Sequence, residues 1–307
     1  MNKRISLKIT PELSGRSVLS VLRQLHISES LLTYLKKLPH GIAVNGSHVT
    51  VRHILRDGET LSVNIDEDES GSSLVPVDMP LDIIFEDEDI IVLNKPPFVP
   101  THPSHGHQTD TLANALCYYF LHNAQEDGNF VFRALNRLDR NTSGVVCVTK
   151  NKYAAALYGA EMAKGRISKK YIAIVDGDMT SLCDGEYHTV STYIRRERES
   201  IITRTVCRAD EDGAAAAISE FKVLKVSADK KHSLVELLPQ TGRTHQLRVH
   251  MAHIGYPISG DGLYGKESPL IARHALHAER LSITLSGEHK SFTAILPPDI
   301  CALLEGF

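Results

Sequence analysis

Residues 136–144 form the densest group of side chains that could do chemistry. The segment runs Asn-Arg-Leu-Asp-Arg-Asn-Thr-Ser-Gly and leads directly into the apolar run Val-Val-Cys-Val. A carboxylate such as Asp139 can act as a nucleophile or stabilise positive charge, and a buried strand behind it would aim it rigidly. The alternative is a polar turn, in which Thr142 and Ser143 bond the backbone and Gly144 takes a positive φ. Composition alone favours the turn.

A second candidate is Arg248, which lies in a segment with helical periodicity. A helix that starts at Thr244 or His245 and ends at Gly255 would turn its apolar residues toward a core. Those apolar residues are Leu247, Met251 and Ile254. Arg248 would share a neighbouring face with His245 and could point into a cleft. An ordinary surface arginine on an amphipathic helix is the simpler interpretation of the spacing alone.

The 16 histidines raise the question of a metal site. Two groups are close in sequence, at positions 102, 105 and 107 and at 245, 250 and 253. A zinc site needs ligands that converge on one point, whereas spacings of five and three put the first histidine on a different helix face from the second. The five cysteines are scattered without a C-x-x-C pair, which fits a reducing compartment and argues against a thiolate site. We therefore expect no metal.

The positioning of these residues depends on the domain organisation, which charge and composition indicate. The chain has 307 residues and a formal net charge of -3. Residues 67–89 contain nine acidic residues and no basic one, whereas residues 1–66 contain nine basic and five acidic residues. The acidic, Gly/Ser-containing stretch cannot bury a face. We expect a small domain at 1–66, a linker at 67–78 and a large domain at 79–307.

The small domain shows two helical patterns followed by short strands. Residues 17–25 and 28–38 carry apolar residues at helical spacing, with Ser28 as the candidate N-cap of the second helix. A strand at 42–44 ends in an Asn-Gly turn, and a later strand covers 60–65. This order resembles the RNA-binding domain typified by ribosomal protein four of the small subunit, although the second helix is less basic than usual there. The alternative is a small α+β appendage that makes no RNA contact.

The large domain alternates short strands with a few helices. A hairpin is expected from the runs 83–85 and 90–93, and buried strands at 145–148 and 171–175. Helices are expected after Asp110, as its cap, and at 151–164. Alternating apolar residues mark two further strands at 281–285 and 292–296. This pattern predicts an α+β fold, a large mixed and mostly antiparallel β-sheet flanked by helices and loops.

Six ordered blocks in the large domain resemble one enzyme family. Arg137-Leu-Asp-x-x-Thr-Ser-Gly144 looks like the signature of the RluA-type pseudouridine synthases, and six fixed residues seldom match by chance. The other blocks follow in the family's order; they are Ile90–Pro96, Lys170–Gly177, Thr241–His250, Gly260–Gly265 and Leu276–Ala278. The resemblance spans roughly residues 80–300. It implies the pseudouridine synthase catalytic fold.

The resemblance also implies a reaction and three catalytic residues. Such an enzyme detaches uracil from its ribose, turns it and rejoins it through carbon. Asp139 matches the family's aspartate, Arg248 the arginine that keeps it ionised and aimed, and Tyr171 the tyrosine that stacks on the target base. The sequence leaves open whether Asp139 attacks the ribose or takes a ribose proton and promotes a glycal intermediate.

Five further residues are implied to bind the substrate. Arg137 would fill the space that an extruded nucleotide vacates, and Leu247 would cover the other face of the base. Thr142, Arg243 and His245 complete the set through their places in the matching blocks. Asn136 departs from the family's more common histidine, and we expect this change to alter loop packing rather than chemistry.

The expected reaction has no redox step and no energy input, so we expect no cofactor. The sequence contains no P-loop and no G-x-G-x-x-G motif. The expected partner is RNA. Ribosomal RNA of the large subunit is the expected substrate and transfer RNA the alternative, because the motifs describe chemistry and not the target. A non-catalytic RNA-binding or ribosome-assembly factor is the competing hypothesis, but it would not need Asp139, Tyr171 and Arg248 together.

The chain carries no signal that indicates a membrane or a protein partner. Its apolar runs are too short to span a bilayer, and the N-terminus lacks a signal-peptide core. No heptad or exposed apolar helix stands out. We therefore expect a cytoplasmic monomer without membrane contact.

Overall fold

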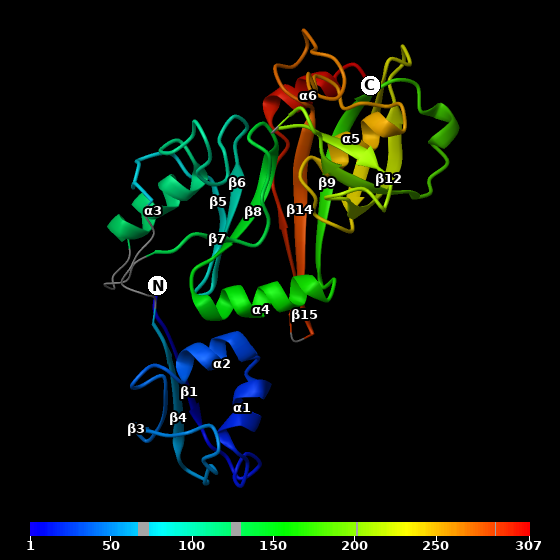
Figure 1. Cartoon of the computed structure of the whole chain (residues 1–307). Helices are drawn as coiled ribbons and strands as arrows, with labels where there is room; N and C mark the ends of the chain where they lie inside the picture. The colour runs from blue at the N-terminus through cyan, green and yellow to red at the C-terminus, as the bar shows by residue number, and fades with distance from the viewer. Residues whose placement is uncertain (67–73, 124–129, 201, 286) are drawn as a thin grey trace.

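The computed structural model describes residues 1–66, 74–123, 130–200, 202–285 and 287–307. It contains a four-stranded sheet within residues 3–65 and an eleven-stranded sheet within residues 83–293. Figure 1 shows the smaller sheet and its two helices at one end of the molecule, below α4 (Lys152–Ala163). Most of the expected linker, residues 67–73, lies outside the described residues; residues 74–78 have neither helix nor strand.

The N-terminal part has the predicted helices and one strand that the sequence did not indicate. Helices α1 (Val18–Gln24) and α2 (Glu29–Leu35) begin at the N-caps Ser17 and Ser28, whose hydroxyls accept backbone N–H bonds. The expected Asn-Gly turn joins β2 (Ile42–Val44) to β3 (Ser47–His48). The additional strand β1 (Lys3–Lys8) pairs antiparallel with β4 (Thr60–Ile65), so it completes the sheet.

The large sheet confirms the predicted α+β class. Its strand order is β11-β10-β12-β13-β9-β14-β8-β6-β5, with β15 beside β14 and β7 beside β8. The strands are β5 (Ile83–Glu86), β6 (Ile90–Lys95), β7 (Arg133–Ala134), β8 (Ser143–Thr149), β9 (Ile167–Asp176), β10 (His188–Arg196), β11 (Arg204–Cys207), β12 (Ala215–Val226), β13 (His232–Pro239), β14 (Leu276–Leu285) and β15 (Glu288–Thr293). Only β8 and β14 pair in parallel among these strands, and the other described pairings are antiparallel.

The helices of the large part connect the strands and cover their faces. They are α3 (Leu112–Asn123), α4, the short 3₁₀ helix η1 (Thr180–Leu182), α5 (Gln246–His253) and α6 (Pro298–Leu304). The N-cap of α4 is Asn151, which accepts from the N–H of Ala154. The predicted cap of α3 is not observed, because the Asp110 carboxylate instead lies 2.6 Å from the ring of His107.

The parallel pairing of β8 with β14 determines where the loop that precedes β8 lies. Ser143 and Gly144 at the start of β8 pair with His277 and Ala278 near the start of β14. Gly144 has a φ of +117, and a Cβ there would lie 2.2 Å from the carbonyl oxygen of Ala278. Only glycine permits so close an approach of the two backbones. The loop before β8 is therefore held beside β14.

The N-terminal part contacts the large part through α4. The hydroxyl of Tyr153 donates to the carbonyl of Leu25 at 3.1 Å, and the ammonium group of Lys152 lies 3.9 Å from the ring centroid of Tyr34. Lys3 pairs with Glu88 and Asp89 at 2.9 Å each. These contacts join the small sheet to the first hairpin and to the helix that follows β8.

Candidate active site

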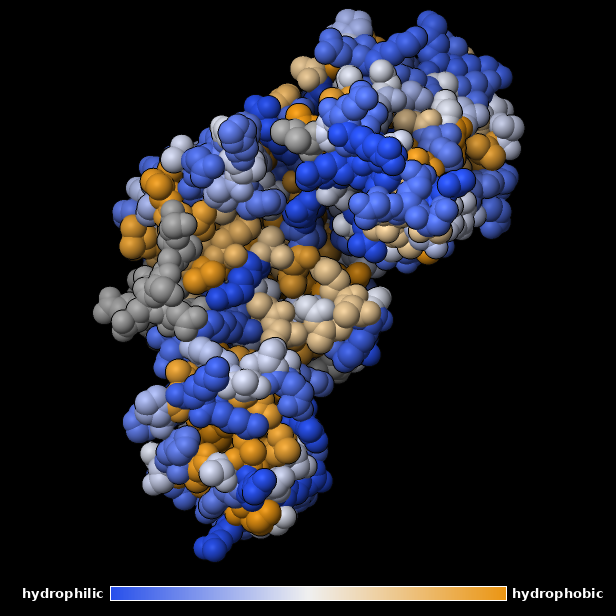
Figure 2. All heavy atoms as spheres, viewed as in Figure 1, coloured by the Kyte–Doolittle hydropathy of each residue, from blue (hydrophilic) through white to orange (hydrophobic). Residues whose placement is uncertain are grey.

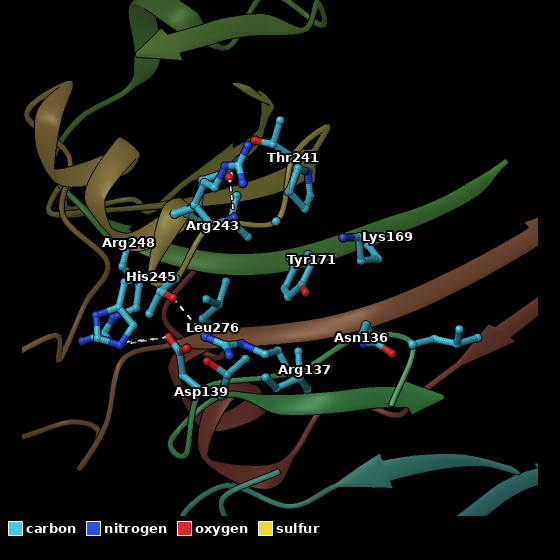
Figure 3. Close-up of a pocket in the computed structure, with 18 of the residues that line it drawn as sticks. Asn136, Arg137, Asp139, Lys169, Tyr171, Thr241, Arg243, His245, Arg248 and Leu276 are labelled. Carbon is cyan, nitrogen blue, oxygen red and sulfur yellow. Dashed lines mark hydrogen bonds and ion pairs between the residues drawn. The ribbon is translucent and has the colours of Figure 1, made fainter. Parts of the chain in front are cut away.

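A cavity of about 200 Å³ opens over β9 and β14, between two loops that are far apart in sequence. One loop precedes β8 and the other joins β13 to α5 (Figure 3). The pocket is lined by every residue that the sequence nominated as catalytic or substrate-binding: Arg137, Asp139, Thr142, Tyr171, Arg243, His245, Leu247 and Arg248. In Figure 2, hydrophilic side chains border the hollow in front of these strands.

The loop before β8 presents Asp139 to the pocket. The carbonyl oxygen of Asp139 accepts a hydrogen bond from the N–H of Thr142 at 3.0 Å, which closes a tight turn. The polar turn that composition suggested is present at this position, but the Thr142 and Ser143 hydroxyls contact His274 and His277 and not the backbone as expected. The turn also exposes the Asp139 carboxylate, whose side chain is 27% accessible. The two sequence interpretations therefore describe one structure, because the turn aims the carboxylate.

Arg248 projects from α5 between two carboxylates. Its Nε and Nη2 donate to the two oxygens of Asp261 at 2.7 Å each, and its Nη1 donates to Asp139 Oδ2 at 3.3 Å. Burial opposes the charge on Arg248, but the hydrogen bonds and charge of Asp261, with the charge of Asp139, raise the pKa of the guanidinium. The sequence-based pairing of Arg248 with Asp139 is thus present, but the arginine is anchored by Asp261.

His245 lies beside the same carboxylate in a strained backbone conformation. It precedes α5 with a φ of 57, and its Nε2 lies 3.7 Å from Asp139 Oδ2. Its Nδ1 lies 2.8 Å from the hydroxyl of Tyr264, which also accepts from the N–H of Arg204. Burial lowers the pKa of His245. A left-handed backbone at a histidine costs energy. The contact of its Nδ1 with the Tyr264 hydroxyl holds the ring next to Asp139.

Tyr171 and Leu247 supply the apolar walls. Tyr171 is 7% exposed and Leu247 is 6% exposed, and both belong to the main core. Burial and the nearby Asp139 charge raise the pKa of the Tyr171 phenol, so it stays protonated at neutral pH. Tyr171 lies within β9 and not at its head as predicted, because residues 167–170 extend the strand by pairing with β14.

The residues that form this partly exposed carboxylate, its paired arginine and the apolar floor lie in a part of the chain that resembles known proteins in sequence. Residues 89–253 match the sequence profile of the family described as RNA pseudouridylate synthase. This chain belongs to that family. The match spans the loop before β8, the tyrosine of β9 and the arginine of α5. The predicted RluA-type family and the predicted enzyme class, RNA pseudouridine synthase, are confirmed.

Relatives align along nearly the whole chain. An uncharacterized RNA pseudouridine synthase of Bacillus subtilis, YjbO, is 37% identical over 286 residues, which are 92% of this chain and 96% of the relative. The ribosomal large subunit pseudouridine synthase D of Neisseria meningitidis is 34% identical over 319 residues, with 98% and 81% covered. The solved structure of human RNA pseudouridylate synthase domain containing 1 has a TM-score of 0.56 at 30% identity, covering 72% of this chain and 86% of that one.

In this synthase, buried side chains hold the catalytic loop through its carbonyl groups. The Thr101 hydroxyl donates to the carbonyl of residue 138 at 2.9 Å. Lys95 is fully buried and donates to three carbonyls, one of which belongs to Arg140 at 3.2 Å. Arg273 donates to the carbonyl of Asn141 at 3.0 Å. The carbonyls of residues 138, 140 and 141 are thus held by three different side chains.

Two buried histidines support the end of the same loop. His274 Nε2 lies 2.8 Å from the Thr142 hydroxyl, and His277 Nδ1 lies 2.9 Å from the Ser143 hydroxyl. Burial, aided by the charge of Arg248, lowers the pKa of His274 to about 3, so its ring is neutral. Thr142 is only 2% exposed, and its hydroxyl already has this partner. Its predicted contact with substrate stays a prediction.

The exposed arginines lie at the rim. Arg137 donates to the Thr244 hydroxyl at 2.9 Å, and Arg243 donates to the carbonyl of Ala216 at 3.0 Å. Asn136 is buried and bonds the β8 backbone, donating to Val145 and accepting from Cys147. Both arginines stand where a polyanion would approach the pocket.

The histidine groups make other contacts in the described parts of the chain. There, no cluster of three or more His, Cys, Asp or Glu side chains could hold a metal ion. His250 Nδ1 and Nε2 face the hydroxyls of Ser219 and Thr192 at 3.0 Å each. His107 contacts Asp110, as described above. No helix of the described chain is both long and apolar enough to cross a membrane.

Sequence reasoning assigned no role to four residues that line or support this site. Asp261, Lys95 and Arg273 were within or beside the matching blocks but were given no role, and Lys169 was not considered. Asp261 carries a detectable signal, since a buried arginine needs a buried partner and a Gly-Asp pair follows Arg248 closely in sequence. The roles of Lys95 and Arg273 depend on which carbonyls the fold brings to them.

Proposed function

We propose that this enzyme converts a specific uridine of large-subunit ribosomal RNA to pseudouridine, with Asp139 as the group that acts on the ribose. The position of the Asp139 carboxylate carries the proposal. It lies at the mouth of the pocket, is paired with Arg248 and has Tyr171 as the adjacent wall. The choice of RNA rests on relatives that are named for the large ribosomal subunit and that align with 98% and 95% of this chain.

The proposed chemistry starts with cleavage of the C1′–N1 bond. Asp139 either bonds to C1′ or removes the proton from C2′, and in both routes the electron pair stays on N1, so uracil leaves as an anion. The base then turns in the pocket, and its C5 bonds to C1′. In the first route the bond between Asp139 and C1′ breaks in this step, and in the second route Asp139 returns the proton to C2′. The C5 proton is released and N1 takes up a proton, which leaves the atomic composition unchanged. Both routes use the carboxylate form of Asp139, and Arg248 supplies the opposite charge beside it.

The base must leave its stack before it can enter the pocket. Extrusion costs a few kcal/mol in lost stacking. Arg137 is exposed at the rim beside Asp139, and we propose that it occupies the vacated space and contacts phosphate. Tyr171 and Leu247 would hold the extruded base between them. Arg243 and His245 would bind the ribose-phosphate next to the base.

The N-terminal part, residues 1–66, is proposed to be a separate RNA-binding domain of the ribosomal-protein-four type. Its helices, the Asn-Gly hairpin and the four-stranded sheet are arranged around their own core. Its excess of basic residues would add affinity through phosphate contacts.

The test compares the parent protein with Asp139→Ala and Asp139→Asn. Each is incubated with unmodified transcripts of large-subunit ribosomal RNA and of transfer RNAs, without added cofactor. Pseudouridine is then mapped by chemical labelling and primer extension. Sites in the ribosomal transcript that only the parent makes would support the proposal. Pseudouridine made by Asp139→Ala would refute the role of Asp139, and sites confined to transfer RNA would refute the choice of substrate.

A further inference from the structure

Lys169 is a cation in the pocket that no described residue neutralises. It lines the cavity together with Tyr171, from two positions earlier on β9. It makes no hydrogen bond or ion pair with any residue that the structure describes. Burial lowers its pKa, and no nearby carboxylate opposes that effect. A desolvated ammonium group without a counterion costs stability, so its presence calls for a ligand.

The neighbouring lysine shows that this isolation is specific to Lys169. Lys170 points to the opposite side of the strand, where its Nζ pairs with Glu236 at 3.0 Å and with Glu279 at 2.7 Å. Two adjacent lysines of one strand therefore have opposite environments. Among the described residues, two carboxylates pair with the outer lysine and none pairs with the lysine in the pocket.

The sheet register places Lys169 on the far side of Tyr171 from Asp139. Ser143 pairs with His277, which pairs with Ile172, whereas Lys169 pairs with Leu281 further along β14. Asp139 precedes Ser143 in the loop, so it lies beyond the end of the paired strands that is remote from Lys169. Figure 3 shows the same order along the pocket: Asp139, then Tyr171, then Lys169. The Cα atoms of Lys169 and Tyr171 are about 6.6 Å apart along the strand.

This order determines which part of a bound uracil would face the lysine. A base stacked on Tyr171 must direct its N1–C1′ edge toward Asp139, because the ribose carbon has to reach that carboxylate. The opposite edge, with its carbonyl oxygen, then points toward Lys169. When the C1′–N1 bond breaks, the negative charge spreads from N1 onto the two carbonyl oxygens of the ring.

We propose that Lys169 is a further catalytic residue, which stabilises the departing uracil anion by donating to a carbonyl oxygen on the edge remote from the ribose. The inference rests on the proposed function. A preorganised donor in a water-poor pocket acts most strongly on charge that develops in the transition state. It would act again when uracil has turned, since the ring stays anionic until C5 bonds to C1′.

The test uses Lys169→Met, which keeps the length of the side chain and removes its charge, and Lys169→Arg, which keeps the charge. The full-length proteins act on the transcripts described above under single-turnover conditions. Lys169→Met should lower the rate about 10²- to 10³-fold with less than about a twofold change in RNA affinity. Lys169→Arg should recover much of the rate. The thermal unfolding temperature of Lys169→Met should equal or exceed that of the parent, because the variant lacks a partly desolvated charge that has no partner among the described residues.

The control is Lys170→Met, which removes a lysine from the same strand. It leaves Glu236 and Glu279 without their ammonium partner, so it should lower the unfolding temperature while the single-turnover rate stays near the parent's. A fall in rate equal to that of Lys169→Met would show that the effect comes from the strand and not from the pocket charge.

Three results would overturn the inference, and they are distinguishable. An active parent with an equally active Lys169→Met contradicts the role of Lys169 alone. Weaker RNA binding with a salt slope reduced by roughly 0.7 to 0.9, at an unchanged saturating rate, would show that Lys169 contacts a phosphate. A parent that modifies neither transcript would refute the proposed function, and the inference would fall with it.

Discussion

Arg248 is held more closely by Asp261 than by Asp139. Two of its nitrogens lie 2.7 Å from the Asp261 oxygens, whereas the third lies 3.3 Å from Asp139. Asp261 is 1% exposed, and it also accepts from the N–H of Leu263 at 3.1 Å. The buried carboxylate therefore fixes the arginine, and the arginine leaves the exposed carboxylate only partly engaged. In the proposed reaction, this arrangement would keep an oxygen of Asp139 available for the ribose.

Replacing Asp261 with asparagine should separate these two roles. The variant leaves a buried arginine without its main counterion, and breaking such a pair typically costs about 3 to 5 kcal/mol. The guanidinium is then free to move onto Asp139 and occupy the oxygen that the ribose needs. We expect a lower free energy of unfolding in urea and a single-turnover rate at least about tenfold lower at saturating RNA. A variant that is destabilised but fully active would show that the position of Arg248 does not limit the chemistry.

Tyr171 allows the stacking and the hydroxyl to be tested separately. Tyr171→Phe retains the ring, so RNA affinity should stay within about twofold of the parent's, while the rate should fall if the hydroxyl assists loss of the C5 proton. Tyr171→Leu removes the aromatic face and should weaken binding by about 1 to 3 kcal/mol, the usual contribution of one stacked base. Filter binding and single-turnover rates measure the two effects. Equal affinity in the parent and Tyr171→Leu would contradict a stacking role.

Much of this fold could be predicted because its signals are local. The Ser28 hydroxyl caps its helix by accepting from the N–H of Leu31, three residues later, and the Asn-Gly turn forms within four residues. The first hairpin and the alternating strands follow from apolar periodicity in the same way. The strand β1 was missed because Lys-Arg-Ile-Ser-Leu-Lys is short and charged, and only its pairing with β4 stabilises it.

The site could be predicted only as a set of residues from a family resemblance. The Gly-Asp pair that follows Arg248 in sequence marks Asp261 as a candidate partner, but how tightly it binds the arginine relative to Asp139 depends on how the chain returns after α5. Lys169 and Lys170 are adjacent and chemically identical, so the sequence cannot tell which one faces the pocket. Strand register decides that question, and register is set by pairing between residues more than 100 positions apart.

Gly144 should tolerate no side chain. Alanine there would place its Cβ 2.2 Å from the carbonyl oxygen of Ala278, at a φ of +117 that L residues rarely adopt. The parallel pairing of β8 with β14 would open, and we expect Gly144→Ala to lower the free energy of unfolding by more than about 3 kcal/mol. The matched control is Gly159→Ala within α4, where nothing lies within 4 Å; it should stabilise the protein by about 0.5 to 1 kcal/mol. Similar effects of the two changes on urea denaturation would contradict the close backbone approach.

His274 should make stability depend on pH. Its folded-state pKa is lowered to about 3 from 6.5 by burial and by the charge of Arg248. As pH falls from 6.5 toward 3, His274 takes up a proton in the unfolded chain while its ring stays neutral in the folded protein. The stability that the neutral ring contributes is therefore fully present above pH 6.5 and is lost as pH falls toward 3. The free energy of unfolding of His274→Gln should therefore change less steeply with pH than that of the parent in this range, by up to about 1.4 kcal/mol per pH unit. The exposed His105→Gln serves as the control and should keep the slope of the parent.

The N-terminal part should contribute affinity and not chemistry. A charge reversal of Lys36 and Lys37, both exposed after α2, keeps the contacts to α4 intact and so tests the surface without removing the domain. If this surface touches phosphates, the double substitution Lys36→Glu and Lys37→Glu should weaken RNA binding and reduce the slope of log Kd against log salt by roughly one for each lost contact. The single-turnover rate at saturating RNA should stay near the parent's, because the pocket lies in the other part of the chain. Deletion of residues 1–66 should show the same pattern more strongly, although it also exposes Tyr153 of α4. Unchanged affinity and salt slope in both proteins would mean that residues 1–66 do not bind RNA.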